Sequence, residues 1–204
     1  MGPATHLLAT QKAARRLVSI SGHPGSGKST FADRLKSELN KASRGIYVLL
    51  PMDGFHFDDA ALRRRGDLPR KGAPHTFDVD GLAAILDRLS ADDGREIAIP
   101  VFDRSIELSR AGAEIISLAA RIVLVEGNHL LLDDLPWRGL EPRFGVTVFL
   151  EVPRSLLAER LSKRWERYGF SPSEINAKLD DNDLPNADIV VDRSNKARFP
   201  ILNH

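Results

Sequence analysis

Gly22-His23-Pro24-Gly25-Ser26-Gly27-Lys28-Ser29 is the stretch of sequence that decides the fold. It satisfies the pattern G-x-x-x-x-G-K-[S/T], in which glycines let the backbone curl around phosphate groups. The apolar run from Leu17 to Ser21 predicts a buried strand before it, and the apolar spacing from Ser29 to Leu39 predicts a helix after it. This order of strand, glycine-rich turn and helix is the context that phosphate binding needs.

The loop predicts a binding site for the phosphates of ATP. Backbone N–H groups would point at phosphate oxygens, and the helix N-terminus would add its partial positive charge. Lys28 would reach the β- and γ-phosphates, and Ser29 would offer its hydroxyl to Mg²⁺. The alternative is a chance match in a structural turn, which the flanking elements disfavour. The expected cofactor-binding residues are Gly22, Pro24, Gly25, Ser26, Gly27, Lys28, Ser29 and Thr30.

Strand-like and helical stretches alternate along the rest of the chain. Further strands are expected at 46–50, 97–101, 121–125, 146–152 and 187–191, and further helices at 79–89 and 153–168. This alternation predicts an α/β fold with a mostly parallel sheet and helices on both faces. We expect a single domain over residues 1–204, in which the polar stretch at about 54–77 forms a long loop. The large side chains of His129, Trp137 and Trp165 are expected in the core by default.

Composition excludes several classes of protein. The 29 basic and 28 acidic side chains among 204 residues nearly cancel, so no overall charge favours nucleic acid or an anionic membrane as partner. Cysteine is absent, which excludes disulfides and thiolate metal sites. No apolar run reaches about 18 residues, and residues 1–16 lack the apolar segment of a secretory signal. A cytoplasmic location is expected, while the sequence does not decide between a monomer and a homodimer.

Two acidic residues follow predicted strands. Ligands of open α/β sheets bind beyond the carboxyl ends of the strands, where Asp53 and Glu126 would both lie. We expect Asp53 to act as a general base on an acceptor hydroxyl, the alternative being a cap of the turn before Gly54. We expect Glu126 to hold Mg²⁺ directly or through water, the alternative being an acid that bonds to nearby loops.

A basic helix is expected at 153–168. Its basic residues fall three and four apart, along one side of the helix: Arg160, Lys163, Arg164 and Arg167. Arginines that close over a transferred phosphoryl group would stabilise its charge. Spacing alone instead favours a solvated face, with Glu159 and Glu166 as ion-pair partners.

With these motifs in place, the chain resembles the uridine kinase, phosphoribulokinase and pantothenate kinase group of P-loop kinases. The resemblance covers about residues 18–191 and looks strongest to a bacterial branch described as fructose-transport-system or nucleoside kinases. The stretches that carry it are Gly22 to Ser29, Asp53-Gly54-Phe55, Pro100-Val101-Phe102-Asp103 and Glu126-Gly127, with support from Arg160 to Arg164 and Asn186 to Val190.

The resemblance implies a three-layer P-loop NTPase fold with a small helical lid at about 154–185. It implies an ATP- and Mg²⁺-dependent kinase that phosphorylates an alcohol of a sugar or nucleoside-like acceptor, with fructose as the first candidate. The implied catalytic residues are Asp53, Lys28, Arg160 and Arg164, with Arg167 as a further lid residue and with Ser29 and Glu126 on the metal. The implied acceptor-side residues are Phe102, Asp103 and Arg104, and Asp78 lies near an acceptor-contacting stretch of the group. Position alone adds His56 and Lys71 as candidates, and Phe55 is a further one.

The acceptor segment departs from that of uridine kinases. Those enzymes carry a Tyr and then a His where this chain has Phe102 and the segment Arg104 to Glu107, which argues against a nucleobase-specific site. A pantothenate- or nucleoside-type kinase is the alternative within the group. A P-loop NTPase or regulatory ATP-binding module without an acceptor is the alternative from another class, and a nucleic-acid-binding ATPase is disfavoured by the even charge.

Overall fold

The computed structural model describes residues 15–203, so nearly all of the stretch in which no secretory signal was expected lies outside the described residues. The strands and longer helices, in chain order, are β1 Arg16–Ser21, α1 Lys28–Ala42, β2 Tyr47–Pro51, α2 Asp59–Arg65, α3 Val79–Ala91, β3 Ile97–Asp103, β4 Leu108–Ile116, β5 Ile122–Gly127, β6 Val146–Glu151, α4 Arg154–Arg167, α5 Pro172–Lys178, α6 Leu184–Arg193 and β7 Phe199–Leu202. Shorter helical turns are η2 Met52–Phe55, η3 Leu68–Arg70, η4 Pro74–Thr76, η5 Trp137–Arg143 and the π-helical turn η6 Leu179–Asp183.

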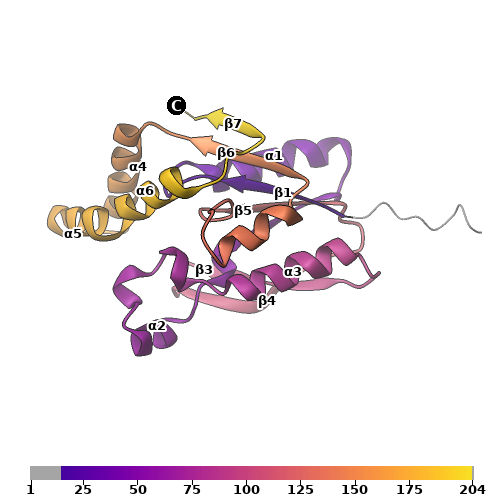
Figure 1. The fold of residues 1–204 in the computed structure, drawn as a ribbon, viewed down its shortest axis with the longest axis horizontal. Coiled ribbons are helices and arrows are strands. Elements are labelled where there is room, and N and C mark those ends of the chain that lie inside the picture. The colour runs from indigo at the N-terminus through magenta and orange to yellow at the C-terminus, as the bar shows by residue number, and fades with distance from the viewer. Residues whose placement is uncertain (1–14, 204) are drawn as a thin grey trace, which may run out of the picture.

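The central sheet has five parallel strands in the order β2-β5-β1-β6-β7. Figure 1 shows α1 on one side of this sheet and α3 on the other. The α/β fold class predicted from the alternation of strands and helices is therefore confirmed.

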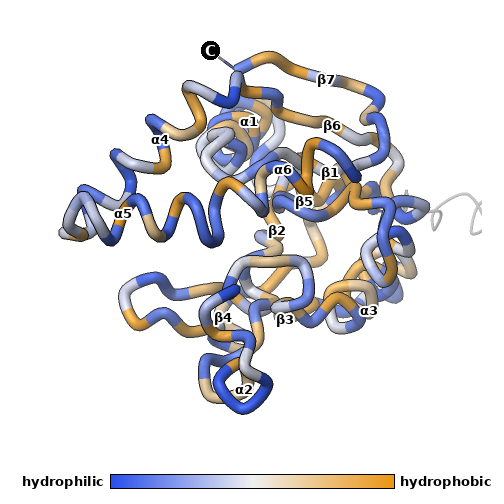
Figure 2. The backbone as a smooth tube through the Cα atoms, turned by 60° about the vertical axis from the view of Figure 1, so that its left-hand side comes forward, coloured by the Kyte–Doolittle hydropathy of each residue, from blue (hydrophilic) through white to orange (hydrophobic). Residues whose placement is uncertain are grey.

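Side chains of β5 explain why the sheet is covered on both faces. Val123 and Val125 belong to the apolar cluster that contains Leu86 of α3, whereas Leu124 belongs to the cluster that contains Ala32 of α1. Successive residues of a strand point to opposite faces, so a continuous apolar run requires a cover on each side. Figure 2 shows the hydrophobic stretches concentrated in the strands and α3, while the peripheral α2 is largely hydrophilic.

Two expected strands differ in the structure. Residues 187–191 belong to helix α6, where Ala187 and Val190 are buried three positions apart and Val191 is exposed. The last strand of the sheet is instead β7, which pairs with β6. The strand predicted at 97–101 exists as β3 but pairs antiparallel with β4 in a separate hairpin, with a register shift around Pro100.

The long loop expected at about 54–77 is largely helical. It contains the second half of η2, then α2, η3 and η4, and Asp58 caps α2 by accepting a hydrogen bond from the Ala60 N–H at 2.7 Å. Backbone bonds from Phe57 to Thr76 and from Asp78 to Phe55 close its two ends on each other. The segment is therefore an ordered subdomain against the sheet. Among residues 15–203, no helix has the length and apolar character needed to cross a bilayer.

Candidate active site

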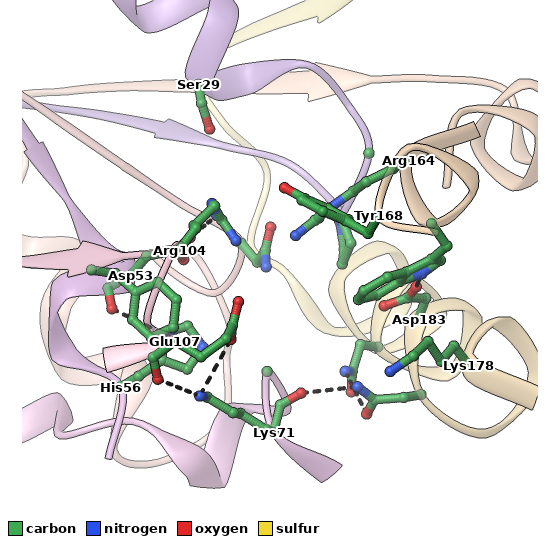
Figure 3. A pocket seen from close by; sticks show the side chains of 18 of the residues that line it. Ser29, Asp53, His56, Lys71, Arg104, Glu107, Arg164, Tyr168, Lys178 and Asp183 are labelled. Atoms are coloured by element: carbon green, nitrogen blue, oxygen red, sulfur yellow. Dashed lines mark hydrogen bonds and ion pairs between the residues drawn. The ribbon is translucent and has the colours of Figure 1, made fainter. Parts of the chain in front are cut away.

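A pocket of about 1000 Å³ lies at the carboxyl ends of β1, β2 and β5. The glycine-rich loop forms one wall, the subdomain at 54–77 and the β3–β4 turn form a second, and helices α4 to α6 form a third (Figure 3). Because parallel strands end at the same edge of a sheet, side chains far apart in sequence meet there.

The glycine-rich loop connects β1 directly to α1. Gly25 and Gly27 have φ angles of 78° and 83°, in the left-handed region that glycine adopts without strain. Most of the predicted cofactor-binding residues line the pocket: Pro24, Gly25, Gly27, Lys28, Ser29 and Thr30. Gly22 and Ser26 do not. Gly22 packs so closely on β6 that a Cβ would lie 2.7 Å from the Leu150 carbonyl oxygen, and Ser26 is fully buried.

Lys28, Ser29 and Glu126 form a polar group at the floor of the pocket. The Ser29 hydroxyl donates to the Glu126 carboxylate, with Oγ 3.2 Å from Oε2 and 3.3 Å from Oε1. Burial raises the pKa of Glu126 to about 7, against the opposing charge of Lys28. Burial also lowers the pKa of Lys28, although the charges of Glu126 and Asp53 oppose this shift. A hydroxyl and a carboxylate side by side are the hard oxygen ligands that Mg²⁺ prefers, so these residues fit that ion.

Asp53 lies in η2, two residues beyond the end of β2. Burial would raise its pKa, but the charges of His56, Arg104 and Lys28 outweigh burial and lower the pKa below the ordinary range. The Asp53 carboxylate therefore stays ionised, as a proton acceptor must. Its Oδ2 lies 2.5 Å from Nη2 of Arg104. Within residues 15–203, the carboxylate bonds to this guanidinium and not to the turn that it was alternatively expected to cap.

The acceptor-side candidates that line the pocket are His56, Lys71, Phe102 and Arg104. A ring nitrogen of His56 lies 2.8 Å from the Asp53 carbonyl oxygen, and the imidazole packs 4.9 Å from the Phe102 ring. Burial lowers the pKa of His56, which favours the neutral ring. Lys71 bonds to Asp59 at 2.6 Å and lies over the Phe102 ring at 5.0 Å. In Figure 3 Arg104 and Lys71 lie across the pocket from the helices that carry Arg164 and Lys178.

Three other acceptor-side candidates do not line this pocket. Phe55 is only 6% exposed and packs in the apolar core, since its side chain turns toward the sheet. Asp78 caps α3, because its carboxylate accepts from the Gly81 N–H at 2.9 Å. Asp103 points away along the hairpin and bonds to Ser105 at 2.6 Å and Arg110 at 3.0 Å. Helix capping and hairpin contacts therefore account for these positions.

The basic residues of helix α4 divide between the two predicted roles, since some line the pocket and one lies on a solvated face. The pocket is lined by the residues at positions i, i+4 and i+7: Arg160, Arg164 and Arg167. Lys163 instead forms an ion pair with Glu159 at 2.5 Å on an exposed face. Buried Leu157 and Leu161 fix the orientation of the helix. The three arginines therefore belong to the pocket, and Lys163 belongs to the solvated side.

Sequence analysis missed most of the wall contributed by the helices after Arg164. Trp165 was expected in the core with His129 and Trp137, but it lines the pocket and donates to Asp183 at 2.6 Å. The ammonium of Lys178 lies 4.5 Å from the Trp165 ring centre. The signal available in the sequence was the aromatic series that directly follows the arginines: Trp165, Tyr168 and Phe170. Other missed lining residues are Leu68, Pro69, Glu107, Asn128, Ala177, Asp181, Asn182 and Asn186.

Comparisons with known proteins place this geometry among P-loop kinases. The profile of the AAA domain family matches residues 18–177. A crystal structure named "putative fructose transport system kinase" from Silicibacter sp. TM1040 is 37% identical, covers 97% of this chain and 95% of its own, and superposes with a TM-score of 0.87. A "putative uridine kinase" from Schizosaccharomyces pombe is 32% identical over 92% of this chain and 82% of its own length. The Escherichia coli protein YggC, described as uncharacterized, is 32% identical over 97% of this chain and 83% of its own length.

Proposed function

Because this chain belongs to the AAA domain family and to the P-loop kinases related to uridine and pantothenate kinases, we propose that it transfers the γ-phosphoryl group of ATP to a small-molecule alcohol. One observation carries the proposal. An ionised Asp53 lines the same pocket as the phosphate-binding Lys28, and the arginines of α4 line it from the opposite wall. A carboxylate could also activate water for hydrolysis, but a protein that only hydrolyses or senses ATP has no need of the additional aromatic-lined space beside Asp53.

Each residue has a definite part in this reaction. The amides of the glycine-rich loop and Lys28 hold the β- and γ-phosphates, while Ser29 and Glu126 hold Mg²⁺, which would neutralise phosphate charge when bound. Asp53 accepts the proton of the acceptor hydroxyl and orients its oxygen for in-line attack. Arg160 and Arg164 stabilise the charge on the transferred group. The region at about 154–185 thus serves as the lid and 54–77 as the acceptor-side loop of a single kinase domain.

The acceptor would occupy the compartment between His56, Phe102 and Trp165. Sugars are the first class of acceptor to test. Fructose is the first sugar, because the 37% identical structure is named a putative fructose transport system kinase. Pantothenate- and nucleoside-type alcohols are the alternatives, since curated relatives carry those names. We further propose a cytoplasmic enzyme that acts on free small molecules and not on nucleic acid or membranes.

A coupled ADP-release screen with Mg²⁺ and ATP against sugars, nucleosides and hydroxy acids tests this proposal. At least one alcohol should stimulate ADP release and appear as a phosphorylated product by mass spectrometry. Asp53→Asn should lower kcat about 10²- to 10⁴-fold, the usual contribution of a general base, while ATP affinity stays within threefold. Asp80→Asn, at an exposed position on α3, is the matched control. ADP release that no alcohol stimulates would instead identify an NTPase module.

A further inference from the structure

Arg70 connects two walls of the pocket that are more than 100 residues apart in sequence. It ends η3 on the acceptor side, and its guanidinium donates to two groups on the helical side. Nη1 lies 2.6 Å from the Asp181 carbonyl oxygen, and Nη2 lies 3.2 Å from Oδ1 of Asn186. Asn186 is only 2% exposed, so one of these acceptors is fixed inside the protein.

Two asparagine contacts extend this connection. Asn182 donates from Nδ2 to the Lys71 carbonyl oxygen at 2.9 Å, and Asn186 donates to Oδ1 of Asn182 at 3.1 Å. Figure 3 shows the bond between the Lys71 backbone and the helical wall crossing the lower end of the pocket. Together with the bonds of Arg70, these contacts form what we call the Arg70 clasp: Arg70, Lys71, Asp181, Asn182 and Asn186.

The π-helical turn η6 supplies the acceptor that Arg70 uses. Residues 179–183 follow an i→i+5 pattern between α5 and α6, and such turns redirect backbone carbonyls from the regular helical ladder. The Asp181 carbonyl can then accept from a side chain outside the helix. In a continuous α-helix the donor to that oxygen would be the N–H of residue 185, but Pro185 has none, so the Asp181 carbonyl is left open to a donor from outside the helix.

The helices joined by the clasp are packed against the helix that carries the pocket arginines. Leu161 of α4 shares an apolar cluster with Ile175 of α5, Leu179 of η6 and Ala187 of α6. On the other side, Lys71 follows Arg70 directly. Its ammonium donates to the backbone carbonyl of Glu107 in the β3–β4 turn at 3.1 Å. Any displacement of α4 toward a nucleotide is therefore transmitted to the acceptor-side loop.

We infer that Arg70 is a positioning residue that couples the order of the acceptor-side loop to the nucleotide-bound position of helices α4 to α6. The inference rests on the proposed function. Its physical basis is that a charged donor bonded to two separate acceptors keeps both walls in register, and an uncharged side chain of similar length does not. Nucleotide binding at the arginines would then prepare the compartment for the alcohol before the alcohol arrives.

Hydrogen–deuterium exchange tests the clasp without knowledge of the acceptor. Calorimetry first measures binding of the Mg²⁺ complex of a non-hydrolysable ATP analogue, and failure of the wild-type protein to bind it would refute the proposed function itself. With the analogue bound, wild-type residues 68–76 should exchange at least threefold more slowly. In Arg70→Met this slowing should vanish, although affinity for the analogue changes by less than threefold. Arg64→Met, at an exposed position on α2, should keep the wild-type response.

Two results would overturn the inference while leaving the kinase proposal standing. One is a wild-type loop whose exchange does not respond to the bound analogue, and the other is an Arg70→Met loop that responds as the wild type does. Arg70→Lys, which retains the charge but cannot reach both acceptors at once, should recover part of the response. This partial rescue separates positioning from general loss of folding. With any acceptor found in the screen, Arg70→Met should raise KM for that acceptor about tenfold and KM for ATP less than threefold.

Discussion

His129 should make the stability of this protein depend on pH in a calculable way. The imidazole is fully buried, one ring nitrogen lies 3.1 Å from the Gly72 carbonyl oxygen, and Nδ1 has no partner among the described residues. Burial lowers the pKa of His129 from 6.5 to about 4. Protonation is therefore easier in the unfolded chain, so the contribution of the neutral ring is complete above pH 6.5 and is lost as the pH falls toward 4.

The size of the effect follows from the gap between the two pKa values. A difference of about 2.5 units, at 1.36 kcal/mol per unit, gives about 3 kcal/mol of unfolding free energy. Urea unfolding of the wild type and of His129→Gln, from pH 8 to pH 4, measures it. Gln cannot be protonated, so the stability difference between the two proteins should shrink by about 3 kcal/mol across this range.

The comparison isolates His129 because the other histidines are present in both proteins. The pKa values of His23 and His56 are also lowered by burial, and their effects cancel in the difference. Parallel profiles for wild type and His129→Gln would show that the buried ring tolerates its proton, and the reasoning would be refuted.

Three further predictions concern the pocket. Lys28→Met should weaken binding of Mg²⁺-ATP about 10- to 100-fold by calorimetry, since a charged donor to phosphate is lost; unchanged affinity would remove Lys28 from the site. Ser29→Ala should raise the Mg²⁺ concentration for half-maximal activity several-fold while metal-free ATP affinity stays the same, and an unchanged Mg²⁺ requirement would contradict its role. Gly54→Ala should lower the unfolding free energy by about 1–3 kcal/mol in urea, because a Cβ there overlaps the Pro100 carbonyl. A variant as stable as the wild type would show that the β3–β4 hairpin shifts to make room for the methyl group.

The sequence predicts the floor of the pocket well because local signals and one rule of geometry determine it. The glycine-rich loop is contiguous, and Asp53 and Glu126 each follow an apolar strand, so parallel pairing alone brings them together. The strand predicted at 187–191 was wrong because a short apolar run fits a buried helix as well as a strand. β7 was missed because its residues are mostly exposed and include Pro200.

The pocket walls could not be predicted because their contacts depend on tertiary placement. Nothing near Arg70 in sequence indicates that its partners are Asp181 and Asn186. Trp165 could equally have completed the core, and only the tilt of α4 turns it toward the cavity. Asp78 was predicted to lie on the acceptor side of the pocket because it is polar and close to the 54–77 segment. In the structure its side chain instead caps the N-terminus of α3. Residue types alone do not distinguish these outcomes.

The β3–β4 hairpin has a body that holds the turn with Asp53 in place and a tip that lines the pocket. Its body is locked to the base-bearing turn, since Pro100 abuts Gly54 and the Ser109 hydroxyl donates to the Gly54 carbonyl. Its tip, residues 104–107, reaches the acceptor compartment and is largely exposed. New tips could therefore be grafted between Arg104 and Leu108 to change the shape of this compartment, while Arg104 keeps its ion pair with the Asp53 carboxylate.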